Sequence, residues 1–494
     1  MGEEALEPES NRADSTDKAP VPNISRSLWS TLRRFLLSIS GVEGIVHSTG
    51  PHLPAQSKVK HLVEATTRSR GSLISPEQRR ALESIMSGHI EAIIDLRDEK
   101  KKYDDPEVAS AFFEERFKEL WAATYEKYQE VGVSAPTSLD LLQATTPREL
   151  ERPTSSVLYS SLLISTVGMC EVFLGQAMRE YLTFRPQALH GTEIRFQFAE
   201  MQQFSSIESL KAYHIDRQVD SIIRQGGIDE WMKWFEVKVK LSFAEVSADP
   251  MAVREIFQRR HVHVHNDGEV SAIYLAKMAD TKRQLPELDT YLRVDESYLL
   301  QAVDRLRTFG IALAVVLARK LTPKGSKDPG LKWLESHAND LVYGLLCANK
   351  YESAVEIVNL LIEDTSEQSV KTMMLVNRWI AQSRLGKEKA VRKEVRDWDT
   401  SALDAKFHLA QLTLLGETEQ AHALAMAEIG RGALTEQNYR EWPLFAPLRE
   451  IYPPTVEQIA SVELVPVQRE ESTADLLKDP PAADEGTTEC HLDD

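Results

Sequence analysis

Two kinds of basic side chain that can act on a phosphodiester lie together in residues 259–270, which read RRHVHVHNDGEV. Histidine titrates near neutral pH, so it can take up and release a proton. Arginine is permanently charged and grips phosphate oxygens through a forked pair of hydrogen bonds. Arg260 and His265 are therefore a candidate pair for cleaving RNA without a metal. The histidine would remove the 2′-hydroxyl proton, and the arginine would stabilise the charge that builds on phosphorus.

The flanking sequence predicts that this pair lies on the last turns of a helix. Apolar residues recur at three- and four-residue spacing from 250 to 257, which is the helical period. The Asn-Asp-Gly run at 266–268 then favours a helix end, because Asn and Gly tolerate the left-handed conformation. On an ideal helix Arg260 and His265 lie about 140° apart. They converge only if the helix end is distorted or if a second copy of the motif faces the first.

The spacing Arg260-His261-x-x-x-His265, followed by Asn-Asp-Gly, resembles the motif of the HEPN superfamily. The resemblance covers roughly residues 153–321. It implies a helical bundle that pairs into a homodimer, with two motifs forming one composite, metal-independent RNase site and no cofactor. By the same resemblance Arg260 binds the phosphate of an RNA substrate, His265 is the acid and base, and His261 and Asn266 support them. Roles in bacterial defence, including antiviral defence, and in toxin or stress systems are what the family implies.

Other interpretations of the three histidines stay open. On a β-strand His261, His263 and His265 would share one face and suit a metal, whereas on a helix His261 and His265 would form an i, i+4 ligand pair. A histidine-rich helix end can also be a solvated or structural feature without chemistry. At the level of function, the alternative to an RNase is a non-catalytic HEPN-like dimer that serves as an interaction scaffold.

Glu171 is the one acid in a nearly continuous apolar stretch, residues 157–182. An unpaired carboxylate in such a helix costs several kcal/mol or stays protonated. We therefore expect Glu171 either to orient Arg260 or His265, or to lie half-exposed beside some other base.

Composition and charge predict a soluble, multi-domain protein of a reducing compartment. The chain has 494 residues, 42% of them hydrophobic, and a net charge of −18. Residues 1–25 and 469–494 hold −11 of that charge, so RNA binding would have to be local. Three separated cysteines give no disulfide framework. The longest apolar run, 309–318, predicts a buried core helix and not a membrane span, so we expect a cytoplasmic protein without membrane contact.

The chain order predicts an all-α protein in which disordered tails flank three helical parts. The tails are residues 1–25 and 466–494. A helical N-terminal domain is expected over 26–133, and its basic amphipathic start could pack on that domain or lie on a membrane. A Pro-, Ser- and Thr-rich linker would follow over 134–156, and a HEPN-like helical domain over 157–321.

Residues 331–452 predict α-α repeats. Three segments each combine an apolar helix, a short polar turn and a helix that starts with alanine. The alanines, Ala354, Ala390 and Ala421, are 36 and 31 residues apart, which loosely resembles the TPR period. Such repeats stack into a curved slab, so we expect a protein or peptide partner on this region.

Overall fold

The computed structural model describes residues 23–49, 58–69, 71, 74–100, 102–103, 105–145, 154–189, 201–281, 284–323 and 328–453. Within these ranges the chain is helical and has no β-strand, apart from one isolated bridge between Glu269 and Tyr291. The predicted all-α fold class is confirmed. The predicted tails lie outside the described residues, except for residues 23–25. The chain divides into two compact units, Met1–Glu388 and Lys389–Asp494.

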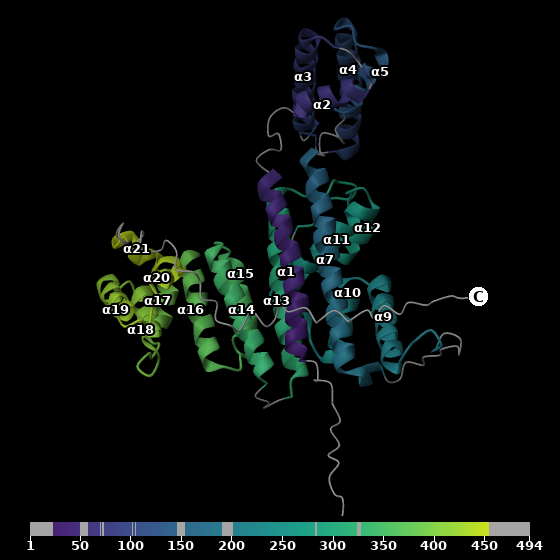
Figure 1. Ribbon diagram of the computed structural model, residues 1–494. Coiled ribbons are helices and arrows are strands. Elements are labelled where there is room, and N and C mark those ends of the chain that lie inside the picture. Colours follow the sequence, from purple (N-terminus) through teal and green to yellow (C-terminus); the bar gives the residue numbers. More distant parts are fainter. Residues whose placement is uncertain are drawn as a thin grey trace, which may run out of the picture. The chain divides into compact units, whose positions relative to one another are not determined.

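Three long helices form the centre of the first unit: α1 (Ile24–Thr49), α7 (Thr154–Phe184) and α13 (Glu296–Leu321) pack along one another (Figure 1). Every residue of α13 from 306 to 318 is buried, which confirms the predicted core helix. Gly310 permits the close approach of α1, because a Cβ there would lie 2.7 Å from the Phe35 ring. Phe35 in turn stacks on Phe173 of α7, with ring centroids 4.9 Å apart.

Helix α1 packs on α7 and α13 and does not belong to an N-terminal domain with the helices that follow it. The prediction of one domain over 26–133 is therefore wrong at its start. The reason is the apolar stripe of α1, whose buried residues include Leu28, Leu32 and Ile39. A stripe this long needs a long apolar partner, which α13 and α7 provide.

Helix α7 is also the one described helix long and apolar enough to cross a membrane by length and composition, over Ser156–Phe184. Helices α1, α13, α11 (Pro250–His265) and α9 (Ile207–Gln225) pack against it. Core helices of soluble proteins also reach this length and hydropathy, so the finding does not by itself establish a membrane span.

Helices α2 (Lys58–Ser69), α3 (Pro76–Lys100), α4 (Pro106–Glu130) and α5 (Ala135–Gln143) have an apolar core of their own. Helix α5 corrects the predicted linker 134–156, because residues 135–143 are helical and Leu141 and Leu142 are fully buried. The Ser and Pro that suggested a linker instead begin the helix. Ser134 caps it by accepting the Thr137 N–H, and a proline occupies its first turn.

His89 of α3 makes this small core sensitive to acid. Its side chain is buried, Nδ1 lies 2.8 Å from the Thr124 hydroxyl, and Nε2 has no hydrogen-bond partner among the described residues. Burial, reinforced by the charge of Lys127, lowers the pKa of His89 to about 4. The unfolded chain therefore binds this proton more tightly than the folded chain does.

We expect the α2–α5 core to lose stability as the pH falls from about 6.5, the ordinary histidine value, towards 4. The full effect is on the order of 3 kcal/mol. Hydrogen exchange of α3 and α4 in the intact chain, corrected for the intrinsic pH dependence, measures it. His89→Gln keeps a polar group near Thr124 but cannot titrate, so it should remove most of this pH dependence. An equal acid response in that variant would contradict the assignment.

The helices that follow α7 in the chain and precede α13 surround the candidate site. They are α9, α10 (Ile228–Val239), α11 and α12 (Ala272–Lys277), and α11 contacts α7, α10, α12 and α13. The aromatic residues Trp231 and Phe235 of α10 are buried, so they pack in the core and are not available to stack on bases.

Helical hairpins follow α13, as the sequence predicts. In the first unit α14 (Pro329–Cys347), α15 (Tyr351–Leu361) and α16 (Gln368–Arg384) pack on one another, and α14 and α15 also contact α13. The second unit holds most of α17 (Glu388–Arg396), with α18 (Ala405–Leu415), α19 (Thr418–Gly430), α20 (Glu436–Glu441) and α21 (Ala446–Ile451). The boundary between the units therefore falls inside the predicted repeat region, 331–452.

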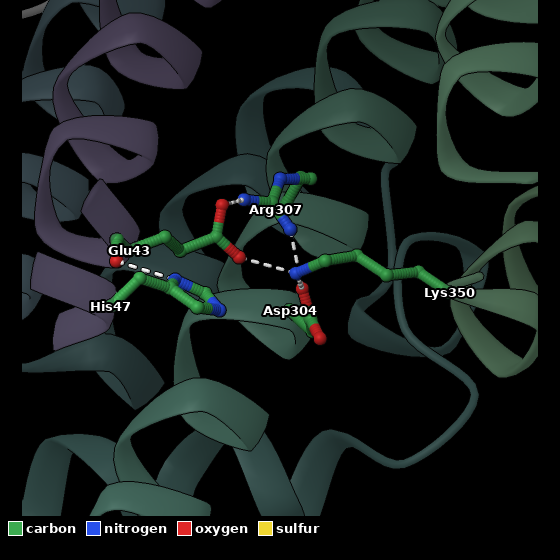
Figure 2. A network of polar contacts seen from close by, with 5 residues as sticks. All are labelled: Glu43, His47, Asp304, Arg307 and Lys350. Carbon is green, nitrogen blue, oxygen red and sulfur yellow. Dashed lines mark hydrogen bonds and ion pairs between the residues drawn. The ribbon is translucent and has the colours of Figure 1, made fainter. Parts of the chain in front are cut away.

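Four charged side chains tie α1, α13 and the turn before α15 together (Figure 2). Arg307 forms ion pairs with Glu43 and Asp304, and Lys350 forms ion pairs with the same two acids. The backbone carbonyl of Glu43 also lies 2.7 Å from Nδ1 of His47. Burial opposes the charge of Glu43, but the hydrogen bond from Lys350 and the charge of Arg307 lower its pKa overall. The two positive and two negative charges compensate one another inside the first unit.

Candidate functional site at the end of helix α11

The candidate site lies on a regular helix. Asp249 begins α11 by accepting the Ala252 N–H at 3.0 Å, and Pro250 occupies the first position. The helix continues through His265, and Asn266 is its C-cap. The predicted helical placement of the motif is confirmed, and the strand that a three-histidine metal face requires is absent at this segment. Because α11 remains α-helical to its end, helix distortion does not bring Arg260 and His265 together.

Arg260 forms an ion pair with Glu171 of α7. The side chains of Arg260 and Glu171 are 20% and 25% exposed, so the pair lies at the edge of the bundle and not in its core. Of the two expectations for Glu171, contact with Arg260 is the one the structure shows. Burial lowers the pKa of Arg260, yet a guanidinium stays charged at neutral pH. The pair fixes the direction of this cation before any ligand arrives.

His261 and His265 lie next to each other, with ring centroids 4.6 Å apart, and both are exposed. Partial loss of solvent contact lowers the pKa of His261, and the nearby charges of His265, Lys277 and Arg260 lower it further. At neutral pH His261 is therefore mostly uncharged and can accept a proton. The two imidazoles therefore form one exposed pair at the end of the helix.

His263 lies on a different side of the helix and is a structural residue. Its Nε2 is 2.8 Å from the carbonyl oxygen of Leu292, and its ring meets the edge of Tyr291. Since successive residues turn by about 100°, His263 does not share a face with His261 and His265. The histidine run therefore divides into an exposed pair and one packed ring.

The turn after α11 closes on the same packed ring. The Asn266 side-chain amide donates to the Glu269 carbonyl, which gives Asn266 a role in shaping the turn. Gly268 follows with φ +80, and an added Cβ would lie 2.3 Å from the Tyr291 ring and 3.0 Å from His263. Only glycine combines this backbone conformation with this lack of space.

Gly268→Ala is accordingly expected to destabilise the first unit by roughly 2–4 kcal/mol, because left-handed strain adds to a ring collision. Thermal unfolding or chemical denaturation measures the loss. Gly386→Ala is the matched control, since Gly386 also has positive φ (+78) but no atom within 4 Å of an added Cβ. It should cost only about 1 kcal/mol. Equal losses at both positions would show that the collision contributes nothing.

The preceding arginine, Arg259, has a different environment that sequence reasoning missed. It forms an ion pair with Glu255 at 2.7 Å, lies 3.8 Å from the centre of the Tyr298 ring, and donates to the Arg293 carbonyl. Tyr274 and Tyr298 both donate hydroxyl hydrogen bonds to Glu255, at 3.1 and 2.5 Å. The available signal was Glu255 four residues before Arg259, the spacing of a helical ion pair.

Among the described residues no group of three or more His, Cys, Asp or Glu side chains is arranged to hold a metal ion. The helical pair of His261 and His265 remains a possible two-ligand set. What the arrangement provides directly is a neutral imidazole, a second imidazole beside it and an oriented guanidinium on the same helix. These are the groups that acid–base chemistry on a phosphate ester needs.

Comparison with known proteins identifies no relative: no family model, no curated protein and no solved structure matches this chain. The resemblance to the HEPN motif and to TPR repeats therefore stays a prediction, and the arrangement of Glu171, Arg260, His261 and His265 supports a function only through its own chemistry.

Proposed function

We propose that this protein is a metal-independent endoribonuclease of the HEPN type, with a composite site built from two copies of helix α11. One observation carries the proposal. The exposed pair of His261 and His265 and the oriented cation of Arg260 lie on one regular helix that ends at the surface of the first unit.

The proposed reaction needs only these groups and the RNA. One imidazole removes the proton of the 2′-hydroxyl, and the freed oxygen attacks the adjacent phosphorus. The bond from phosphorus to the 5′-oxygen breaks, and an imidazolium returns a proton to that oxygen. The products are a 2′,3′-cyclic phosphate and a 5′-hydroxyl. Arg260 would stabilise the charge on the phosphate oxygens. His265 and His261 would take the proton from the 2′-hydroxyl and return one to the 5′-oxygen.

The helix geometry is the reason for invoking a second copy. Arg260 and His265 lie about 140° apart around α11, and Arg260 is directed towards Glu171 on α7. In a two-fold dimer the arginine of one protomer can face the histidines of the other, and symmetry then creates two equivalent sites. The hairpin region 331–452 would bind a protein or peptide that regulates the nuclease.

A non-catalytic dimeric scaffold is the second candidate, and one observation favours it. The ion pair with Glu171 already neutralises Arg260 in the single protomer, so a phosphate would have to compete with a carboxylate for it. Catalysis requires that the guanidinium bind phosphate with the nitrogens that Glu171 leaves open. The scaffold needs no such exchange.

The lowered pKa of His261 predicts the pH dependence of cleavage. Protonation removes the base, so the acid limb of the rate profile should lie below about 6.5, the ordinary histidine value. Lys277→Gln removes a positive charge that lowers this pKa, so the limb should move to higher pH. A pH–rate profile of both proteins measures the shift. A limb that stays in place in the variant would mean that His261 is not the titrating base.

The proposal is tested by incubating the purified full chain with RNA in excess EDTA, beside a His265→Ala control. We expect cleavage by the wild-type chain, products ending in 2′,3′-cyclic phosphate, and none above background from the variant. Activity that EDTA abolishes and zinc restores would favour metal chemistry at the histidine pair instead. No cleavage by either protein, with dimers present, would favour the scaffold.

A further inference from the structure

A cavity of about 240 Å³ lies beside α11 among residues that the RNase proposal does not use. Ala252, Glu255 and Arg259 of α11 form one wall, and Tyr298, Ala302 and Arg305 of α13 form another. The remaining wall comes from Tyr274 of α12, Met278, Thr281 and residues 284–286. At this size the cavity is smaller than the roughly 300–1,000 Å³ that drug-sized ligands occupy. It suits a small metabolite.

The one acid in this wall is already fully engaged. Glu255 accepts hydrogen bonds from Arg259, Tyr274 and Tyr298, and its charge is compensated by Arg259. Burial and the carboxylate of Glu255 raise the pKa of both tyrosines, so they stay neutral donors. A cationic ligand would therefore find no free carboxylate here.

Arg305 is the loosely held charge at the edge of the cavity. Among the described residues its ion-pair partner is Asp249 at 4.0 Å, the outer limit of an ion pair, and its side chain is 37% exposed. Asp249 is committed to capping α11 through its other oxygen, which accepts the Ala252 N–H. A guanidinium with so weak a partner can accept a carboxylate or phosphate with little competition.

We propose that this cavity binds a small organic anion whose charged group pairs with Arg305. The apolar part of the ligand would lie against Ile256, Met278 and Leu285, which also line the cavity. The inference does not depend on RNase activity, because none of these residues belongs to the proposed reaction. It assigns α11 two sides, one with the exposed histidines and one with a ligand cavity.

Occupancy of the cavity should be detectable at the segment beyond it. Arg259 lines the cavity and donates to the carbonyl of Arg293, and the neighbouring Leu292 carbonyl contacts His263. A ligand that restricts Arg259 should therefore slow amide exchange in residues 290–294. Non-specific binding elsewhere on the surface would not produce this local protection.

Benzoate is the probe, because it combines one carboxylate with a compact apolar body. We expect it to bind the full chain with a dissociation constant of about 1–10 mM, measured by ligand-observed NMR, and to protect residues 290–294 from exchange. Two controls are benzyl alcohol, which lacks the charge, and benzylamine, which has the opposite charge. Both should bind at least tenfold more weakly, because neither can form the charge-assisted contact with Arg305.

Two substitutions locate the binding site. Arg305→Gln should weaken benzoate binding about tenfold or more, while Arg224→Gln, at an exposed arginine outside the cavity, should leave it unchanged. Ala302→Phe should fill the cavity and abolish binding; because Ala302 is buried, folding of that variant is checked by its thermal transition. Failure of benzoate to bind the wild type, binding that Arg305→Gln leaves intact, or equal binding of benzylamine would each overturn the proposal.

Discussion

Replacing His265 or Arg260 with alanine is expected to lower the rate of RNA cleavage by orders of magnitude. Loss of the histidine removes a proton carrier, so we expect the cleavage rate to fall roughly 10²–10⁴-fold. Loss of the arginine removes the cation that stabilises the developing phosphate charge, so we expect the cleavage rate to fall about 10²–10³-fold. Initial rates on a labelled RNA, with helical content checked by circular dichroism, measure both effects.

Three further substitutions separate chemistry from structure in this series. Arg260→Lys should recover little activity, because a single ammonium cannot reproduce the forked phosphate contact. Glu171→Gln should retain the fold but loosen the direction of Arg260, giving a smaller loss than Arg260→Ala. His263→Ala should lower the melting temperature, since it removes the contacts to Leu292 and Tyr291, while the folded fraction still cleaves. Full activity of the His265→Ala protein would exclude the proposed proton transfer.

Arg307→Met is expected to cause a large loss of stability. The Arg307 side chain is only 8% exposed and pairs with Glu43 and Asp304, so its removal leaves two carboxylates with Lys350 alone (Figure 2). Breaking a buried ion pair on one side costs about 3–5 kcal/mol. Chemical denaturation of the full chain measures it. Arg116→Met, at an exposed arginine with an i, i+3 partner, is the control and should leave the stability nearly unchanged.

The same network predicts sensitivity to acid. The pKa of Glu43 is lowered in the folded chain, so its stabilising effect is present above the ordinary carboxylate range and is lost as the pH falls through the lowered value. Glu43→Gln should therefore lower the free energy of unfolding at neutral pH and flatten its decline below the ordinary carboxylate range.

For the Arg307 prediction, an Arg307→Met protein as stable as the wild type would show that the ion pairs contribute nothing net to the fold.

The regular parts of the fold could be predicted because they follow periodicity. The helix that begins near Pro250 and the hairpins after residue 331 carry apolar residues at helical spacing. The buried run at 309–318 is continuous, and its length favours a helix over a strand. The extent of domains could not be predicted in the same way. Helix α1 and α5 have correct helical signals, but which core buries them depends on contacts with segments distant in the chain.

The candidate site was predictable where one helix determines it. The separation of His263 from His261 and His265 follows from the helical turn, and the structure places the rings accordingly. The contact between Glu171 and Arg260 was one of two open expectations. The two residues are 89 positions apart on different helices, and the sequence does not say how those helices pack. The environment of Arg259 was missed, since Tyr274 and Tyr298 reach Glu255 only in the folded bundle.

The most direct test of the composite site is to mix two inactive proteins, Arg260→Ala and His265→Ala, under conditions in which protomers exchange. A site that takes its arginine from one copy and its histidine from the other is complete once in each mixed dimer. With random pairing half of the dimers are mixed and each has one of two sites, so roughly a quarter of wild-type cleavage should return. No recovery from a mixture shown to contain mixed dimers would contradict the two-copy site.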